Sequence, residues 1–479
     1  MDPSTPAVAA DSPAGGPAPS EKSPQSAERL PAGEKGALGI GEGVINLNVN
    51  LPNVLSNPVF NLYLGVNPFL TGIALTIPRL WDGFIDPVMG HISDNVRWKY
   101  GRRRPFLLAG GILTAVFGFA MWLFPVGRSE TFYFVYLLGS SILMYTSMTI
   151  FAVPYGAMVM EATSNYHERT RLMIVRFFFT YVTLLVVQWL FAITQLKAFA
   201  NPVAGARAAG GIVAGLTLLC ALIPFFFARE RRAAPPASTR PKLLFFASLK
   251  ATLRNRFFLV VVGVYTLGFL GATMTANLGL YTNIYYVHHG DARTASIVQG
   301  WAGTTGILAA MTLMPLLHVF GTRVDKRRAL FACLCLSLVG AAGSWFLYDP
   351  ALPYLQLVAK GLISPGLCAL LIFSSSMLAD VCDEDQLRTG HRREGMYWAV
   401  FSWIQKTALS LSFTVAGFIL LKTGFNSSLP VQSESTVFWI RLSYTAIMTL
   451  TFGGALLLLC SYRLTEERMR EIRHALSAA

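Results

Sequence analysis

The chain has 479 residues, of which 53% are hydrophobic and 13% are charged, and its mean hydropathy is +0.50. This composition is typical of a polytopic membrane protein and excludes a single soluble core. The formal net charge of +14 does not indicate nucleic-acid binding. Its basic residues lie between apolar segments rather than on one amphipathic face, so we expect no nucleic-acid partner.

The first 36 residues are rich in Pro, Ala, Ser and Gly and lack the apolar core of a signal peptide. We therefore expect residues 1–36 to be a disordered cytoplasmic tail. Twelve segments of about 20 residues or more follow, each long enough for a hydrocarbon core about 30 Å thick. These spans run approximately over 40–64, 68–93, 105–126, 131–160, 171–195, 206–228, 257–287, 294–319, 328–348, 352–381, 395–422 and 436–462.

The loops after the even-numbered spans contain the clusters of Lys and Arg, whereas the opposite loops hold little beyond Arg128 and Arg293. Cytoplasmic loops carry the excess of positive charge, so both termini are expected on the cytoplasmic side. The predicted organisation is a six-helix half over 37–228, a linker with a short interfacial helix over 229–256, a second half over 257–462 and a cytoplasmic tail over 463–479.

A short pattern occurs twice. Gly90 and Asp94 end the second span and precede a basic cluster, and Gly321 and Asp325 do the same after the eighth span. Matching positions indicate a parallel duplication of a six-span unit, as in major facilitator transporters. The predicted fold class is an all-α membrane protein with twelve transmembrane helices in two six-helix halves.

The second span contains two carboxylates, Asp82 and Asp86. Their spacing places both on one face of a helix, about 6 Å apart. Each carboxylate at membrane depth costs roughly 2.5 to 3.5 kcal/mol, so such residues face the bundle interior and mark an ion or proton path. A structural pair satisfied by a basic neighbour is the alternative. Two adjacent carboxylates in a low dielectric should share a proton or hold a cation.

Four blocks resemble the glycoside-pentoside-hexuronide:cation symporters, the family of the bacterial melibiose permeases. The blocks are Arg79-Leu-Trp-Asp82-x-x-x-Asp86-Pro87-x-x-Gly90, Val153-Pro154-Tyr155-Gly156-Ala157 with Tyr166-His167-Glu168-Arg169-Thr170-Arg171 and Arg176-Phe177-Phe178, Ala379-Asp380-Val381-x-Asp383 leading to Arg393-Glu394-Gly395, and Lys406. The resemblance implies a secondary active transporter that moves a saccharide or glycoside inward with a cation, by alternating access.

The resemblance also implies roles for particular residues. Asp82 and Asp86 form the coupling-cation site, Lys406 faces them from the other half, and Arg176 lines the sugar cavity. Lys406 is equally interpreted as a structural counter-ion or as a substrate contact, and Arg176 as a cavity residue or a packing or gate residue. The candidate substrate-binding residues are Asn46, Tyr155, Arg176, Asn283, Trp398 and Lys406.

The chain departs from the family pattern at several positions. The carboxylates that grip sugar hydroxyls in the melibiose permeases align with Asn46 and Ala152, so that clamp is not carried over. Sodium-using members have an asparagine where Ile85 stands. Losing an oxygen ligand weakens a sodium site more than a proton site, so we hypothesise H+ coupling through Asp86 rather than Na+.

Charged residues gather at the cytoplasmic ends of several spans. We expect them to form salt bridges that close an inner gate; the alternative is a solvated loop that only sets topology. The candidate gate residues are Asp94, Arg102, Arg103, Arg104, Glu168, Arg169, Asp380, Asp383 and Arg393.

The sequence contains no nucleotide-binding loop or catalytic triad, and its six cysteines show no CxxC spacing. We therefore expect no enzyme activity, no metal site and no cofactor other than a co-transported H+ or Na+. The expected partners are a small saccharide and the lipid bilayer, and the chain is expected to be a monomer. Short loops suit a bacterial inner membrane. A lysolipid carrier of the same fold and a non-transporting membrane sensor are the alternative functions.

Overall fold

The computed structural model describes residues 30–96, 101–163, 166–230, 245–323, 325–390, 393–427, 429 and 431–478. Every regular element in these residues is a helix. In chain order the elements are α1 (Ala32–Ile40), α2 (Glu42–Ser56), η2 (Asn57–Tyr63), α3 (Pro68–Asn95), α4 (Arg104–Ala120), α5 (Glu130–Glu161), α6 (Tyr166–Thr194), α7 (Pro202–Phe227), α8 (Phe245–Arg254), α9 (Arg256–Tyr281), η3 (Thr282–Val287), α10 (Ala292–Arg323), α11 (Lys326–Leu347), η4 (Pro353–Leu355), α12 (Gln356–Thr389), α13 (Glu394–Lys422), α14 (Glu434–Cys460) and α15 (Glu466–Ala478).

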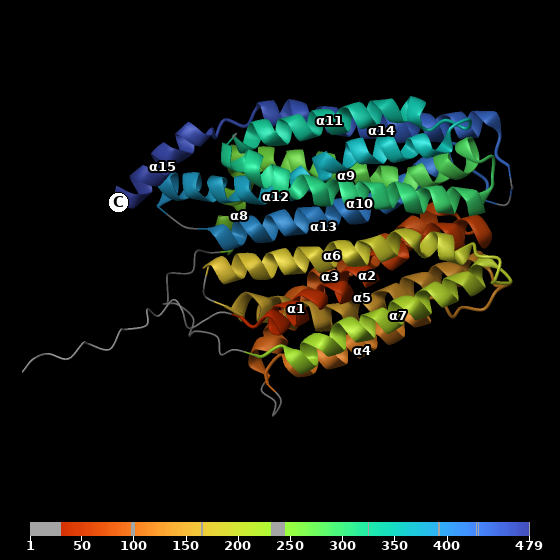
Figure 1. The fold of residues 1–479 in the computed structure, drawn as a ribbon, viewed down its shortest axis with the longest axis horizontal. Helices are drawn as coiled ribbons and strands as arrows, with labels where there is room; N and C mark the ends of the chain where they lie inside the picture. Colours follow the sequence, from red (N-terminus) through yellow and green to blue (C-terminus); the bar gives the residue numbers. More distant parts are fainter. Residues whose placement is uncertain are drawn as a thin grey trace, which may run out of the picture.

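The long helices form two groups that lie side by side (Figure 1). In the N-terminal group α2 packs on α6 and α7, and α5 packs on α3 and α4. In the C-terminal group α12 packs on α10 and α11, and α9 packs on α13 and α14. Contacts of α3 with α13 and of α6 with α10 join the two groups. These four helices therefore form the interface between the groups.

The two ends of the bundle differ in charge. Helices α8 and α15 lie at the left end in Figure 1, together with the α3–α4 and α12–α13 connections. We call this the basic end, because these connections carry the clusters of Lys and Arg. The opposite end, at the right, carries the α2–α3, α9–α10 and α13–α14 connections.

One local arrangement occurs in both groups near the opposite end. Helix α2 continues into the π-type turn η2 and α9 continues into the π-type turn η3. A glycine with positive φ follows each turn, Gly65 at +75° and Gly290 at +96°. The next helix is then capped by a side chain: Asn67 accepts from the Phe69 N–H at 2.9 Å, and Asp291 accepts from the Arg293 N–H at 3.0 Å.

The two groups are in close contact near the opposite end. A Cβ at Gly72 on α3 would lie 2.5 Å from the carbonyl oxygen of Phe413 on α13, so glycine permits this approach of the two backbones. In the same region the Tyr281 hydroxyl donates to the Asn61 side chain at 2.8 Å. These contacts fasten α2–η2 and α3 to α9 and α13 at that end.

Eight helical segments within the described residues are long and apolar enough to cross a membrane. They correspond to α5, α6, α7, α9 with η3, α11, η4 with α12, α13 and α14, and α4 is a shorter apolar helix. Helix α3 lies outside this set and contains the polar residues Arg79, Asp82 and Asp86. The chain is therefore an all-helical membrane protein, and the count of twelve spans stays a prediction.

The predicted disordered tail over 1–36 extends too far. Helix α1 begins at Ala32, because its first residues are held against the N-terminal group. Lys35 pairs with Glu168 at 3.0 Å, and Glu34 accepts from the Arg229 N–H at 3.2 Å. Residues 1–29 lie outside the described part of the chain. In the predicted linker, 231–244 lie outside it as well, and α8 occupies ten of the remaining residues.

Candidate cation site and cavity

Three charged side chains meet at the interface between α3 and α13. The Lys406 ammonium donates to Asp82 Oδ2 at 3.0 Å and also contacts Asp86 Oδ2. On the other side, the Thr149 hydroxyl of α5 donates to Asp82 Oδ1 at 2.5 Å. The i, i+4 spacing turns both carboxylates toward α13, which explains why one ammonium reaches both. Two carboxylates and one ammonium leave this cluster with a formal charge of −1.

The cluster is only partly shielded from solvent. The side chain of Asp82 is 12% exposed, that of Asp86 34% and that of Lys406 41%. Asp82 is thus fixed by two donors inside the bundle, whereas Asp86 has open space beside it. Asp86 is therefore the more accessible of the two carboxylates.

Arg79, on the same helix as the two carboxylates, contacts the inside of α2. It lies one turn before Asp82 on α3, is buried, and donates to the Asn53 side chain at 2.5 Å and to the Val49 carbonyl oxygen at 3.3 Å. Its guanidinium also lies over the Phe413 ring, 5.1 Å from the ring centroid. Val49, Asn53 and Phe413 all line the cavity described next.

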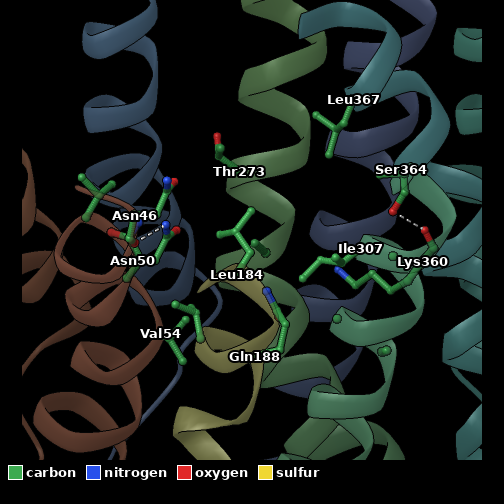
Figure 2. A pocket seen from close by; sticks show the side chains of 18 of the residues that line it. Asn46, Asn50, Val54, Leu184, Gln188, Thr273, Ile307, Lys360, Ser364 and Leu367 are labelled. Carbon is green, nitrogen blue, oxygen red and sulfur yellow. Dashed lines mark hydrogen bonds between the residues drawn. The ribbon is translucent and has the colours of Figure 1, made fainter. Parts of the chain in front are cut away.

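A cavity of about 620 Å³ lies between the two groups, within the range usual for small-molecule sites. Helices α2 and α6 form one wall, and α9, α10, α12 and α13 form the other. Figure 2 shows the asparagines of α2 facing Thr273 and Lys360 across this space. Its polar lining residues are Asn46, Asn50, Asn53, Asn57, Thr180, Gln188, Thr273, Asn277, Gln299, Lys360 and Ser364.

The cavity also offers flat aromatic and apolar faces. Tyr181, Phe191, Phe269 and Phe413 contribute rings, and aliphatic side chains such as Leu184 and Ile307 fill the remaining lining. Amides and hydroxyls beside aromatic rings suit a polyhydroxylated ring, whose edge makes hydrogen bonds and whose face stacks. The lining therefore suits an amphipathic cargo.

The structure places the predicted substrate residues in different surroundings. Asn46 lines the cavity, and its amide donates to the Thr180 hydroxyl at 3.4 Å. Lys406 is engaged in the acidic cluster. Tyr155 is fully buried in the N-terminal group, where its hydroxyl donates to the Leu38 carbonyl oxygen, so it does not contact the cavity. Trp398 is 53% exposed and lies two turns before Lys406, against Phe401.

Asn283 and Arg176 are also engaged by partners within the protein. Asn283 is fully buried, donates to the Ala295 carbonyl oxygen at 2.9 Å and accepts from Gln356 at 2.9 Å. Arg176 pairs with Glu42 on α2 at 2.6 Å, with its guanidinium over the Tyr155 ring. Buried polar groups are satisfied in this way by each other, and the placement favours the packing interpretation of Arg176.

The predicted gate residues of the N-terminal group form pairs within that group. Arg103 pairs with Glu161 at 2.5 Å, and Arg102 lies 3.3 Å from the same carboxylate. Glu168 pairs with Lys35 and with Arg171. Arg104 donates to the carbonyl oxygen of Phe225, and Arg169 to that of Met160. The side chain of Asp94 lies outside the described residues.

The predicted gate residues of the C-terminal group also lie near partners of their own group. Asp380 pairs with Lys326 at 2.6 Å, and Arg393 pairs with the fully buried Asp385 at 2.7 Å. Asp383 is half-buried near them on α12. Each ion pair described at the basic end thus joins residues of one group. A gate between the groups stays a prediction.

Sequence reasoning assigned no role to two charged residues that the structure makes prominent, Glu42 and Lys360, and it did not predict the partner of a third, Asp385. Glu42 holds Arg176, Asp385 anchors Arg393, and Lys360 extends into the cavity. Lys360 was recognisable as a lone lysine in an otherwise apolar span, a rare and costly placement. The pairs Glu42–Arg176 and Asp385–Arg393 depend on tertiary contacts, which residue spacing does not reveal.

Membrane-spanning helices in two groups, with a charged cluster and a polar cavity between them, are features of membrane transporters. A model of the family described as MFS/sugar transport protein matches residues 39–466. The chain therefore belongs to that family, which is similar to the melibiose permeases.

Several individual proteins are similar along nearly their whole length. An uncharacterized symporter of Synechocystis sp. is 25% identical, covering 95% of this chain and 98% of the relative. The isoprimeverose transporter of Lactiplantibacillus pentosus is 24% identical, covering 91% and 89%. The sodium-dependent lysophosphatidylcholine symporter 1 of Mus musculus is 23% identical, covering 86% and 82%.

Solved structures support the fold. A bacterial homolog of the human lysosomal transporter Spinster matches with a TM-score of 0.65 at 14% identity, covering 92% of this chain and 96% of that one. At this level of identity the match concerns the architecture alone.

Proposed function

We propose that this protein is a secondary active symporter that couples inward movement of a saccharide or glycoside to a cation, with H+ favoured over Na+. The observation that carries the proposal is the Asp82–Asp86–Lys406 cluster, which joins the two groups of helices about one turn of α13 before Leu409, a residue that lines the polar cavity. A change in the charge of this cluster alters contacts between the groups, which is what coupling requires.

The proposed architecture has twelve spans in two six-helix halves, 32–228 and 257–462, with 229–256 as linker and 463–479 as C-terminal tail. The spans are Ala32–Tyr63, α3 to α7, α9 with η3, and α10 to α14. Support comes from the recurrence of the π-type turn, the positive-φ glycine and the capped helix in each group. Both termini and the basic end face the cytoplasm in this proposal, in a bacterial inner membrane.

The proposed cycle begins at the charged cluster. Binding of a cation at Asp86 lowers the negative charge of the cluster and weakens its hold on Lys406. The two groups then rock about the cavity, and cargo and cation leave together on the cytoplasmic side. An elementary charge moving down 100 mV supplies about 2.3 kcal/mol, which corresponds to roughly fifty-fold accumulation of cargo.

The choice of H+ rests on the partners of the carboxylates. Asp82 and Asp86 accept hydrogen bonds from Lys406 and Thr149, and Ile85 offers no side-chain oxygen between them. A sodium ion needs several oxygen ligands at once, whereas a proton needs one accessible carboxylate. Uptake that increases with sodium at fixed pH and membrane potential would contradict proton coupling.

The test is external alkalinisation of de-energised cells that overproduce the protein, on addition of mono-, di- and oligosaccharides. A sugar-specific alkaline pulse is expected with the wild type and should be absent with Asp86→Asn. Thr407→Val, one residue after Lys406, is a matched control on α13, because its hydroxyl donates to the Trp403 carbonyl oxygen instead. Absence of any pulse from well-folded wild-type protein would contradict proton–sugar symport.

A lysolipid carrier of the same fold is the second candidate. It is favoured by the similarity to the lysophosphatidylcholine symporter and by the apolar share of the cavity lining. Flux of a fluorescent lysophosphatidylcholine that no saccharide competes with would establish it over the saccharide.

A further inference from the structure

Lys360 is the charged residue that lines the central cavity in the described part of the chain. It lies on α12 about one turn after Gln356, the first residue of that helix. Gln356 donates to Asn283 of η3 at 2.9 Å, which places this part of α12 near the opposite end of the bundle. Figure 2 shows the Lys360 side chain extending past Ile307 toward the side of the cavity on which Gln188 lies.

The acidic cluster lies at another depth of the bundle. Helix α3 also begins near the opposite end, and at 1.5 Å per residue Asp82 lies about 21 Å along it from Pro68. Lys360 lies only about 6 Å along α12 from Gln356. The two sites therefore differ in depth by about 15 Å, and the cluster is too far away to supply a counter-ion in contact with Lys360.

The ammonium of Lys360 has no partner within the described residues. No ion pair or hydrogen bond of this group occurs among them, and no aspartate or glutamate of the described chain lines the cavity. The backbone carbonyl oxygen of Lys360 accepts from the Ser364 hydroxyl at 2.9 Å, but the ammonium takes no part in this contact. Lys406 and Arg176, in contrast, each contact a carboxylate.

An ammonium without a counter-ion needs water or other oxygen acceptors around it, because burial without them is unfavourable. Alternating access requires the cavity to close around its contents, and closure removes water from the Lys360 ammonium. A saccharide brings hydroxyl oxygens that accept hydrogen bonds in place of that water. Closure without a saccharide leaves the ammonium with neither.

We propose that Lys360 prevents the transporter from changing its access with a cation bound but no cargo, and so suppresses uncoupled leak of the cation. The inference rests on the proposed symport and specifies how its coupling is enforced. In the empty transporter the Asp82–Asp86–Lys406 cluster carries a formal charge of −1, which offsets the charge of Lys360. A proton on Asp86 removes this offset, so the closed, cargo-free interior then holds an uncompensated positive charge.

The experiment measures proton leak into proteoliposomes that contain the purified full chain and a pH-sensitive dye in the lumen, with no saccharide present. Valinomycin and equal potassium on both sides hold the membrane potential at zero while the outside is acidified. Lumen acidification by Lys360→Gln should be about 10- to 100-fold faster than by the wild type, because the unpaired charge is gone. Lys360→Arg should leak as slowly as the wild type.

Two further variants and a control complete the design. Lys360→Gln/Asp86→Asn should abolish the leak, because the proton-carrying carboxylate is missing. Lys360→Gln/Ser364→Lys returns an ammonium to the cavity wall one turn further along α12 and should restore the slow rate. Lys197→Gln, in an exposed loop outside the cavity, is the matched control and should leak as the wild type does. Thermal melting of each variant verifies that it is folded.

Equal leak rates of the wild type and Lys360→Gln, or a leak that persists in Lys360→Gln/Asp86→Asn, would overturn the inference. The proposed symport is tested separately by the saccharide-specific alkaline pulse of the wild type. A normal pulse together with a leak that does not depend on Lys360 would overturn the role of this lysine alone and leave symport standing.

Discussion

The close approach of α3 and α13 at the opposite end makes a prediction about which side of the transporter is closed. Gly72→Ala places a Cβ 2.5 Å from the Phe413 carbonyl oxygen, whereas ordinary contacts begin at 3.4 Å. The backbones must therefore separate by about 0.9 Å, the difference of these two distances. Overpacking of this kind costs about 1 to 3 kcal/mol.

Overpacking raises the free energy mainly of the conformations in which the two groups touch at the opposite end. Such a cost shifts the equilibrium toward conformations open at that end by about 5- to 150-fold. The assay is labelling of Thr273→Cys, whose side chain lines the cavity, by a membrane-impermeant maleimide in intact cells. The six native cysteines are first replaced by serine. Labelling should be faster with Gly72→Ala than without it.

Gly139→Ala on α5 is the matched control, because a Cβ there meets nothing within 4 Å, and it should leave the labelling rate unchanged. An unchanged rate with Gly72→Ala in a protein of unaltered melting temperature would refute the reasoning. It would mean either that this contact does not close the cavity, or that the opposite end does not face outside.

Two further substitutions test the ion pairs that sequence reasoning missed. Glu42→Gln leaves the partly buried Arg176 without its carboxylate. We expect the free energy of unfolding to fall by about 2 to 4 kcal/mol, which a lower melting temperature would show. The double variant Glu42→Gln/Arg176→Gln should recover part of this loss. Asp385→Asn weakens the hydrogen bonds that hold Arg393 at the junction of α12 and α13. We expect the free energy of unfolding to fall by about 3 to 5 kcal/mol. Equal melting temperatures of the variant and the wild type would contradict this expectation.

Composition and the length of the apolar segments were sufficient to predict an all-helical membrane protein. The spacing of Asp82 and Asp86 also predicted a shared face, since it depends only on local helix geometry. The contact of Lys406 with both carboxylates was expected only through the family resemblance, because the residues lie more than 300 positions apart.

The cavity lining was harder to predict. Helix α5 is apolar around most of its circumference, so the sequence did not show that Tyr155 points toward α1 rather than toward the cavity. Asn46 was a candidate substrate residue, and it does line the cavity together with Asn50. The sequence shows Lys360 as a lone lysine in an apolar span. It does not show whether a carboxylate lies near this lysine, because that depends on the packing of helices far apart in the sequence.

The most direct test of the central claim is gradient-driven uptake of a labelled glycoside into proteoliposomes containing the purified protein. We expect accumulation when the lumen is alkaline relative to the outside, no stimulation by an inward sodium gradient, and loss of accumulation with Asp86→Asn. The variant should still exchange glycoside across the membrane when no gradient is applied. Accumulation that persists in Asp86→Asn, or that follows sodium alone, would contradict proton coupling through the Asp82–Asp86–Lys406 cluster.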